Sequence, residues 1–251
     1  MKSIVLLTIC ALVSYAYAIH NGEVVKPNSI PYQVLLLVYR DGKISKCGGS
    51  LVKADRVLTA AHCLKDRDYV EVFVGAHKLH DRREKSRQTQ KVEPSALFPH
   101  PLWEPGNGYD VGIVKLPIPF ELNDDVALVK LPYGLEDKDL VGDIAKISGW
   151  GEIDDEHDHV GPLREVENPI ISNKECEKHI KIDAGNICMS GEGGRRTCSG
   201  DSGGPLVIKY NGETVQVGLT SKGEGGCSGV HPSVFTRVTY YLNDFIKDNL
   251  A

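Results

Sequence analysis

The 251-residue chain lacks most of the patterns that mark specialised classes of protein. It has no C-x-x-C pair, so cysteine-based zinc binding is not indicated, and it has no Asn-x-Ser/Thr site, so no N-linked glycan is expected. Beyond the N-terminus, no apolar run approaches the length of about 20 residues that a helix needs to span a bilayer. The formal charge is -5, which argues against a nucleic-acid-binding protein because such proteins carry a basic face.

The overall composition is that of an ordinary globular protein. Hydrophobic residues make up 41% of the chain and charged residues 25%, which excludes intrinsic disorder. The 26 glycines and 13 prolines are scattered without a period, which excludes collagen and coiled coils. The length allows one large domain or two small ones.

The N-terminus has the pattern of a secretory signal peptide. Lys2 is followed by an apolar run from Ile4 to Val13 and by the small-x-small sequence Ala16-Tyr17-Ala18. We therefore predict a signal peptide over 1–18 and a secreted, extracellular protein that begins at Ile19. A membrane anchor is the alternative, but the run is too short to span a bilayer. Cleavage after Ala16 would instead leave Tyr17-Ala18 as a short propeptide.

The remaining cysteines predict disulfide bonds. Cys10 leaves with the signal peptide, and an even number of cysteines in a secreted chain indicates three disulfides. Six cysteines allow 15 pairings, among which counting cannot choose. The six are Cys47, Cys63, Cys176, Cys188, Cys198 and Cys227.

Short β-rich runs separated by turn residues dominate the chain. Asp41-Gly42 follows the run 32–39, and Asn211-Gly212 separates 205–210 from 213–218, so both are predicted hairpins. A helical period of apolar residues occurs only over 238–250. The pattern therefore predicts an all-β protein built from barrels, with one C-terminal helix and a linker near 122–132.

Two segments are strongly charged, the basic 80–87 and the acidic 152–159. Runs of charge are usually solvated loops, and this is the simplest interpretation of both. A partner-binding surface is the alternative for the basic loop. Weak metal capture by His157 and His159 is the alternative for the acidic one.

Three separated segments could together carry nucleophilic catalysis. Ser202 lies among glycines in Gly200–Pro205, where small neighbours would admit a substrate carbonyl and leave backbone N–H groups available to an oxyanion. Serine needs a base to remove its proton, and the candidate is His62, next to Cys63. Asp110 precedes an apolar strand and could fix the tautomer of that imidazole.

These segments, in this order, resemble the chymotrypsin/trypsin-like serine protease family. The segments 47–51, 148–151 and 232–238 also fit the family pattern, and the resemblance extends from Ile19 to Leu250. It implies two packed antiparallel six-stranded β-barrels, the first about 19–125 and the second about 133–237, followed by a helix over about 238–250. The site would lie in the cleft between the barrels of one serine protease domain, 19–251.

The resemblance also assigns roles to individual residues. His62, Asp110 and Ser202 would form the catalytic triad, and the N–H groups of Gly200 and Ser202 the oxyanion hole. A freed α-amino group at Ile19 would pair with Asp201. The disulfides implied are Cys47–Cys63, Cys176–Cys188 and Cys198–Cys227.

Several positions depart from the family pattern. The N-terminal sequence Ile19-His20-Asn21-Gly22 has Asn where a glycine is usual, although Asn tolerates a left-handed backbone. Lys222 replaces a tryptophan at the cleft wall. The loop 76–87 lacks the carboxylate pair that trypsins use for calcium, so we expect no metal there and no cofactor elsewhere.

The residues implied for the specificity pocket are Arg196, Ser221, Gly223 and Ser233. Arg196 stands where trypsins carry Asp, which argues against cleavage after Lys or Arg. Either Arg196 pairs with an acidic substrate residue, helped by Lys222, or it turns outward toward water or Glu192 and leaves a neutral pocket for a large apolar residue.

The sequence therefore predicts a secreted serine endopeptidase that forms an acyl-enzyme. Its partners would be protein or peptide substrates and serine protease inhibitors, without nucleic acid or membrane, and the protein would be a monomer. The alternative is a catalytically inactive homologue that acts as a binding protein.

Overall fold

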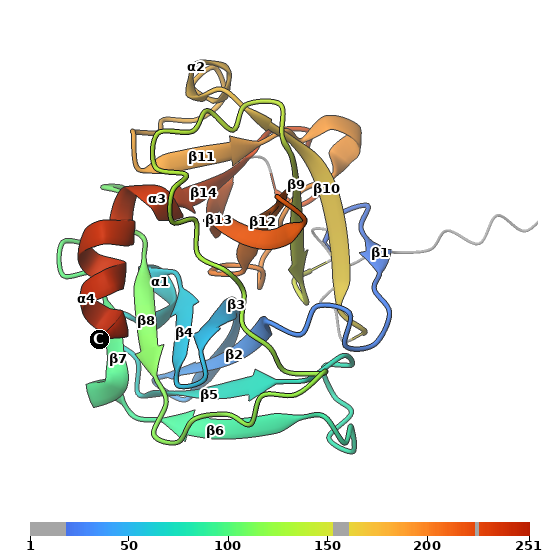
Figure 1. The fold of residues 1–251 in the computed structure, drawn as a ribbon, viewed down its shortest axis with the longest axis vertical. Helices are drawn as coiled ribbons and strands as arrows, with labels where there is room; N and C mark the ends of the chain where they lie inside the picture. The colour runs from blue at the N-terminus through green and yellow to red at the C-terminus, as the bar shows by residue number, and fades with distance from the viewer. Residues whose placement is uncertain (1–18, 153–160, 224–225) are drawn as a thin grey trace, which may run out of the picture.

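The computed structural model describes residues 19–152, 161–223 and 226–251. The predicted signal peptide, 1–18, and all but the first residue of the acidic segment 152–159 lie outside the described residues, so the interpretations of both remain predictions. Figure 1 shows two curled sheets, one above the other, with a helix at the C-terminus.

The first half of the chain forms one seven-stranded sheet in the order β6-β5-β2-β3-β4-β8-β7. All its neighbouring strands are antiparallel. Its strands are β2 (Gln33–Arg40), β3 (Lys43–Lys53), β4 (Arg56–Thr59), β5 (Tyr69–Val74), β6 (Gln88–Val92), β7 (Leu97–Pro99) and β8 (Gly112–Lys115).

The second half forms the other sheet, in the order β1-β10-β11-β14-β13-β12-β9. Because β9 also pairs with β10, six of its strands close into a barrel and β1 is added at one edge of β10. Its strands are β1 (Glu23–Val24), β9 (Ile144–Gly149), β10 (Arg164–Ile171), β11 (Asn186–Met189), β12 (Pro205–Tyr210), β13 (Glu213–Gly223) and β14 (Ser233–Arg237).

The predicted all-β class is thus confirmed, with one difference in detail. The second half is the expected six-stranded closed barrel, whereas the first is a curled sheet whose edge strands β6 and β7 do not pair with each other among the described residues. In β5 buried and half-buried residues alternate, so that one face of the strand packs inward.

Both predicted hairpins form, and their turns explain why. Asp41 and Gly42 have φ values of 50° and 73°, and Asn211 and Gly212 have 49° and 81°. Two successive left-handed residues make the turn whose twist matches that of paired strands, and Asp, Asn and Gly adopt this conformation most readily. The turns therefore fix the registers of β2 with β3 and of β12 with β13.

The helical segments are short except at the C-terminus, where α3 (Val238–Tyr241), a π-helical stretch η3 (Leu242–Ile246) and α4 (Lys247–Leu250) follow one another. The others are α1 (Ala61–Leu64), η1 (Pro94–Ala96), α2 (Asn173–Cys176) and η2 (Glu192–Gly194). None of the helices in the described part of the chain is long and apolar enough to cross a membrane.

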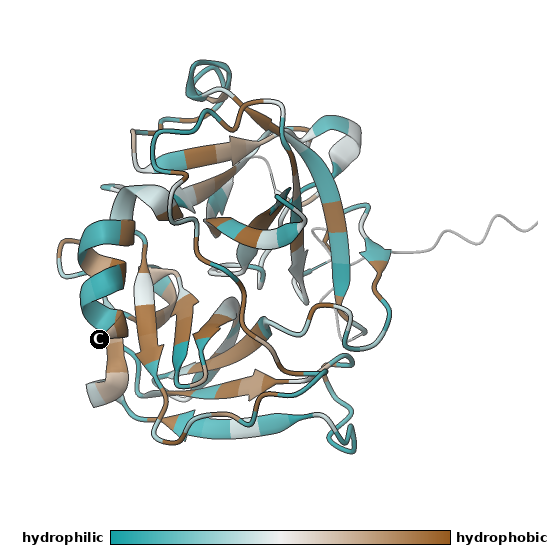
Figure 2. Ribbon diagram, in the orientation of Figure 1, coloured by the Kyte–Doolittle hydropathy of each residue, from teal (hydrophilic) through white to brown (hydrophobic). Residues whose placement is uncertain are grey.

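Each half has its own apolar core, and a third cluster joins them. The third cluster contains Ile113 from the first sheet, Leu219 from the second, and Leu242 and Ile246 from the C-terminal helix. Figure 2 shows apolar residues along the strands and on one side of this helix. The helix thus packs across both halves and fixes the seam at which they meet.

Candidate active site

The two halves approach each other closely at a pair of glycines. A Cβ atom on Gly48 of β3 would lie 2.8 Å from the Cα of Gly204, so the two backbones touch. The N–H of Gly48 donates to the carbonyl of Ser202 at 2.7 Å. The first half therefore holds the backbone of the serine that belongs to the second.

His62 is held by its own short helix. It lies in α1, directly after β4, where the neighbouring Cys63 is bonded to Cys47 of β3. The guanidinium of Arg67 donates to the carbonyls of His62, at 2.6 Å, and of Cys63, at 3.2 Å. These contacts fix the main chain from which the imidazole projects.

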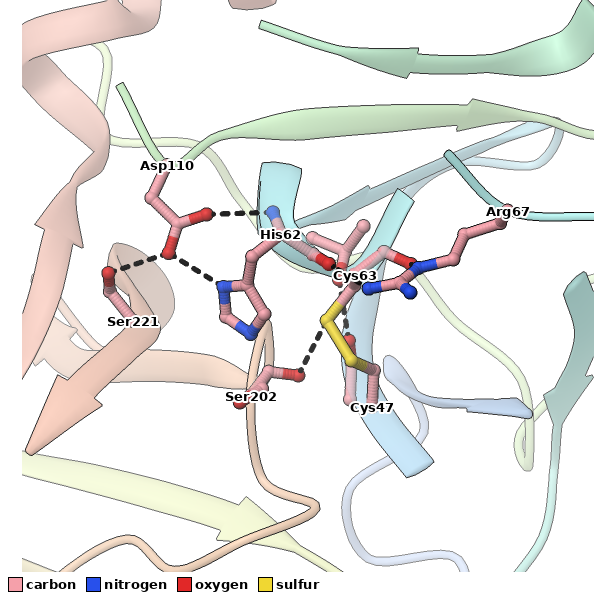
Figure 3. The surroundings of a disulfide bond; sticks show 9 residues. Cys47, His62, Cys63, Arg67, Asp110, Ser202 and Ser221 are labelled. Carbon is pink, nitrogen blue, oxygen red and sulfur yellow. Dashed lines mark hydrogen bonds and ion pairs between the residues drawn. A yellow bond between two sulfur atoms is a disulfide. The ribbon is translucent and has the colours of Figure 1, made fainter. Parts of the chain in front are cut away.

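Asp110 binds His62 at two points and is itself held by the second half. Its Oδ2 lies 2.8 Å from Nδ1 of His62, and its Oδ1 accepts the main-chain N–H of His62 at 3.0 Å. The hydroxyl of Ser221 donates to Oδ2 at 2.6 Å, and that of Thr236 donates to the Asp110 carbonyl at 2.8 Å. Figure 3 shows the carboxylate between the imidazole and Ser221.

The charge state of Asp110 determines the tautomer of the imidazole. Burial by itself raises the pKa of this carboxyl, but the hydrogen bond and charge of His62 and the hydrogen bond from Ser221 outweigh burial and hold the pKa below its usual value. An ionised carboxylate only accepts hydrogen bonds, so Nδ1 of His62 carries a proton toward Asp110. The lone pair of a neutral imidazole is then on Nε2.

Ser202 lies on the Nε2 side of this ring, away from Asp110 (Figure 3). Nearby, Gly200 has a φ of 93°, a conformation that favours glycine. Among the described residues, the N–H groups of Gly200 and Ser202 have no protein acceptor. Two unused donors beside a serine are what an oxyanion requires.

The turn that presents Ser202 requires a glycine at position 203. Gly203 has a φ of 78°, and a Cβ there would lie 2.1 Å from Oγ1 of Thr59. We expect Gly203→Ala to lower the free energy of unfolding by at least about 3 kcal/mol, because backbone strain and the clash with the first half add. Urea unfolding in a Ser202→Ala background would measure this without autolysis.

Gly134→Ala is the matched control. Gly134 has a φ of 80° but nothing within 4 Å of its Cβ position, so its substitution carries the backbone strain alone, about 1–2 kcal/mol. Equal losses of stability in the two variants would contradict the close contact at Gly203.

The disulfides join the cysteine pairs that the resemblance implied: Cys47 with Cys63, Cys176 with Cys188 and Cys198 with Cys227. In the described part of the chain, the two groups of side chains close enough to share a metal ion each contain one of these disulfides. Disulfide sulfurs are not thiolates, so neither group offers a usual set of metal ligands.

Asp201 and Ile19 are both buried in the second half. The carboxylate of Asp201 accepts the N–H of Gly151 at 2.8 Å and of Cys198 at 3.0 Å. Burial raises its pKa to about 6 even though these hydrogen bonds act in the opposite direction. Ile19 packs in the core of the barrel, and Asn21 has a φ of 57°, the left-handed conformation that Asn tolerates.

Next to Ser202 is a cavity of about 220 Å³. Its lining includes Arg196, Ser221 and Gly223 from the predicted pocket and also Thr197 and Gly226, which sequence reasoning missed. Arg196 is 2% exposed, so the outward orientation suggested by the sequence is wrong. Its Nη2 would lie 2.9 Å from a Cβ on Gly223, so the side chain extends from one cavity wall to the other.

Of the residues expected at the pocket, Ser221 and Lys222 line the cavity as predicted, and Ser233 does not. Ser233 is fully buried and does not line the cavity, because its hydroxyl contacts the N–H and the hydroxyl of Thr197, each at 3.1 Å. Ser221 lines the cavity, yet its hydroxyl binds Asp110. The ammonium of Lys222 donates to the carbonyl of Lys181 at 3.0 Å.

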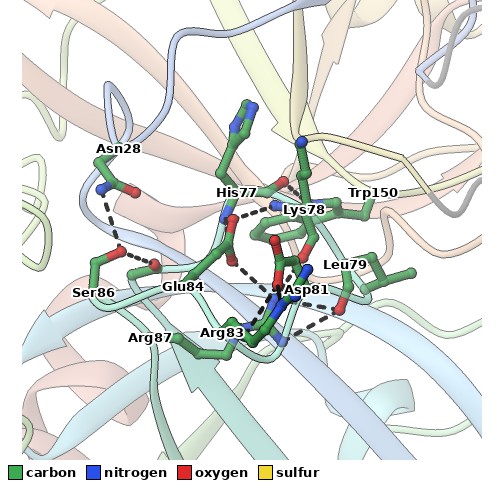
Figure 4. Close-up of polar contacts among 11 residues, drawn as sticks. Asn28, His77, Lys78, Leu79, Asp81, Arg83, Glu84, Ser86, Arg87 and Trp150 are labelled. Atoms are coloured by element: carbon green, nitrogen blue, oxygen red, sulfur yellow. Dashed lines mark hydrogen bonds and ion pairs between the residues drawn. The ribbon is translucent and has the colours of Figure 1, made fainter.

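The basic loop 80–87 is organised around one ion pair. Glu84 accepts the N–H groups of His77 and Lys78, and Arg87 pairs with Glu84 at 3.0 Å (Figure 4). Arg87 also donates to the carbonyl of Leu79. These contacts give the loop a defined conformation. The guanidinium of Arg87 lies inside the loop, where it pairs with Glu84.

Comparisons with known proteins point to one family. The Trypsin family model matches residues 19–246. A chymotrypsin from Phaedon cochleariae is 41% identical over 89% of this chain and 79% of its own length. A brachyurin from Leptuca pugilator is 37% identical over 89% of this chain and 95% of its own.

A solved structure titled HL collagenase has a TM-score of 0.82 and 31% identity, and the match covers 92% of this chain and 98% of that one. The family match spans nearly all of the described residues, both halves of the fold included. The chain belongs to the trypsin family of serine proteases.

Proposed function

We propose that the chain is a secreted serine endopeptidase that hydrolyses peptide bonds through Ser202, His62 and Asp110. The observation that carries the proposal is the contact of Asp110 with both Nδ1 and the main-chain N–H of His62, with Ser202 on the Nε2 side of the ring. Three disulfides agree with an oxidising, extracellular location.

In this mechanism Oγ of Ser202 attacks the substrate carbonyl carbon while Nε2 of His62 takes the hydroxyl proton. The N–H groups of Gly200 and Ser202 bind the oxyanion that forms. Asp110 stabilises the imidazolium, which then gives its proton to the departing amine. Water then attacks the ester carbonyl while His62 takes its proton. His62 returns that proton to Oγ of Ser202 as the acid is released.

An active-site label tests the proposal directly. A fluorophosphonate should phosphonylate Ser202, because it reacts with a serine that a neighbouring base activates. Mass spectrometry should place the label on Ser202, and Ser202→Ala should remain unlabelled. If the unsubstituted mature protein stays unlabelled and hydrolyses no peptide, it is an inactive homologue with a binding role.

Activation in this proposal requires a free α-amino group at Ile19. The new ammonium would pair with the buried carboxylate of Asp201, which directly follows Gly200, and so order the oxyanion hole. Since Ala18 precedes Ile19, signal peptidase itself would expose this terminus. N-terminal sequencing of the secreted, active protein should begin at Ile19, and an active form that begins at Tyr17 would refute this route.

The pH dependence of stability should report the same pairing. In the uncut chain the pKa of Asp201 is raised to about 6, so its carboxyl is protonated at low pH at no cost. As the pH rises from 4 to 7, the folded state must hold a buried anion and loses roughly 2 kcal/mol of stability. In the cut chain the ammonium pairs with the carboxylate, which lowers this pKa and removes the loss.

Urea unfolding of both forms at pH 4.5 and 7.5, each carrying Ser202→Ala, measures the difference between them. Asp201→Asn is the control, because it has no charge to titrate and should remove the difference. The same pH dependence in the cut and uncut forms would contradict the pairing.

For specificity, we propose that the cavity beside Ser202 accepts an acidic side chain before the scissile bond. Arg196 lines the cavity and its guanidinium reaches Gly223, so that a positive charge on the cavity wall would attract a carboxylate and repel Lys and Arg. A guanidinium has five N–H donors in a planar fork and can bind a carboxylate while it keeps other partners.

A further inference from the structure

A second cavity of about 560 Å³ adjoins the proposed oxyanion hole at Gly200. Gly200 lines the second cavity, Ser202 and Arg196 line the first, and Ser199 lines both. Because the cavity beside Ser202 would take the residue before the scissile bond, the second one lies where the chain after that bond would leave the site. The two cavities are neighbours, since they share Ser199.

The floor of this groove is apolar. It is formed by Leu35 and Leu37 of β2, Ile44 of β3, Phe73 of β5 and the buried Leu79. Ile44 is 59% exposed, so part of this apolar surface faces solvent in the free protein. An apolar substrate side chain would remove this surface from water, at about 25 cal/mol per Å².

The rim of the groove is mainly basic. Of its cations, Arg87 is paired with Glu84, and Lys46 donates to the carbonyl of Trp150 at 3.3 Å. Arg82 and His80 are exposed on the loop 80–87, and no carboxylate in the described part of the chain forms a salt bridge with Arg82. These two side chains are thus placed to meet a negative group in the groove.

One acidic residue, Glu152, also lines the groove, but at the end near Ser199. Its Oε2 lies 3.8 Å from the sulfur of Cys198 and 3.9 Å from that of Cys227. The negative charge is therefore at the end of the groove next to the Cys198–Cys227 disulfide, while the exposed positive charge of Arg82 is on the loop 80–87.

We propose that this groove binds the substrate segment after the scissile bond and selects an apolar residue followed by Asp or Glu. The apolar side chain packs on the floor formed by β2 and β5, and the carboxylate contacts Arg82. This inference rests on the proposed protease function, because the occupant is the substrate itself. It assigns the basic loop 80–87 a role in substrate selection.

Acyl transfer to added peptides measures this binding separately from the cavity beside Ser202. An ester substrate first forms the acyl-enzyme, which then partitions between water and a peptide amide that enters from the leaving-group side. The acceptors are Ala-Leu-Glu-amide, Ala-Leu-Gln-amide, Ala-Leu-Lys-amide and Ala-Ser-Glu-amide. We expect Ala-Leu-Glu-amide to be preferred over Ala-Leu-Lys-amide by about 10-fold at low salt, and the preference to shrink as salt screens the charge.

Arg82→Gln and Arg83→Gln form a matched pair for the test. Arg83 is the neighbouring cation, its side chain is 94% exposed, and it does not line the groove. Arg82→Gln should bring the Glu-over-Lys preference to about 2-fold or less, whereas Arg83→Gln should leave it unchanged. Replacement of Leu by Ser in the acceptor should weaken acyl transfer in all three proteins.

The outcomes separate this inference from the proposed function. If the ester gives no burst of acyl-enzyme, both are overturned. If the burst occurs and the acceptors with Glu and Lys partition equally, or if the two variants have the same effect, the groove does not select acidic segments and only this inference is overturned.

Discussion

Ser202→Ala and His62→Ala are each expected to lower kcat by about 10⁴-fold or more, and Asp110→Asn by about 10⁴-fold, the magnitudes found for other Ser-His-Asp triads. Ser202 supplies the atom that attacks the substrate, and His62 is the base whose lone pair faces it. Asn at position 110 would accept where Asp accepts but could also donate an N–H to Nδ1, which would favour the tautomer with its proton on Nε2. The imidazole would then be unable to take the proton of Ser202.

Steady-state hydrolysis of a peptide ester and urea unfolding should be measured together on the same variants. Stability should change little in Ser202→Ala, whose side chain has no structural hydrogen bond among the described residues. The losses should not add in the double variant Ser202→Ala/His62→Ala, because the residues act as a unit. Near-full activity in any one of these variants would refute the assignment of that residue.

Arg196→Ala is expected to change which substrate is cleaved. In the unsubstituted protein we expect peptides with Glu before the scissile bond to be hydrolysed with a higher kcat/KM than those with Leu, and those with Arg hardly at all. Removing a charge-assisted contact of about 1.5–3 kcal/mol should lower kcat/KM for Glu by about 10- to 100-fold. The emptied cavity should raise kcat/KM for Leu or Phe by about 10-fold, since the side chain no longer reaches Gly223.

Arg195→Ala is the control for this experiment. It removes a neighbouring positive charge that does not line the cavity beside Ser202, so it should leave the ratio of Glu to Leu cleavage unchanged. A preference for Leu in the unsubstituted protein would show that Arg196 does not receive the substrate carboxylate, and a preference for Arg would overturn the assignment of the pocket.

Much of the fold could be predicted from short-range patterns. Turn chemistry at Asp41-Gly42 and Asn211-Gly212 defines two hairpins, because the left-handed conformations needed there are a property of those residues themselves. Likewise the period of apolar residues over 238–250 defines the C-terminal helix. The family motifs around His62, Asp110 and Ser202 predicted the residues that the fold brings to the seam between its halves.

Contacts between residues far apart in the chain could not be predicted. The hydroxyl of Ser221 binds Asp110, 111 positions away, rather than remaining available to the cavity it lines. The hydroxyl of Ser233 contacts Thr197 behind the cavity wall. No local pattern encodes such contacts, because they depend on the side on which each strand of the barrel presents its residues.

The sequence by itself determined the family, the strand-rich architecture and the three segments that carry the proposed triad residues, because these depend on residue type and local conformation. Only the tertiary structure decided the orientation of Arg196, since a charged side chain in a loop turns inward or outward according to the walls around it. The groove between Gly200 and the loop 80–87 was likewise decided by the packing of β2, β3 and β5 against the second half, which places an apolar floor beside a basic rim.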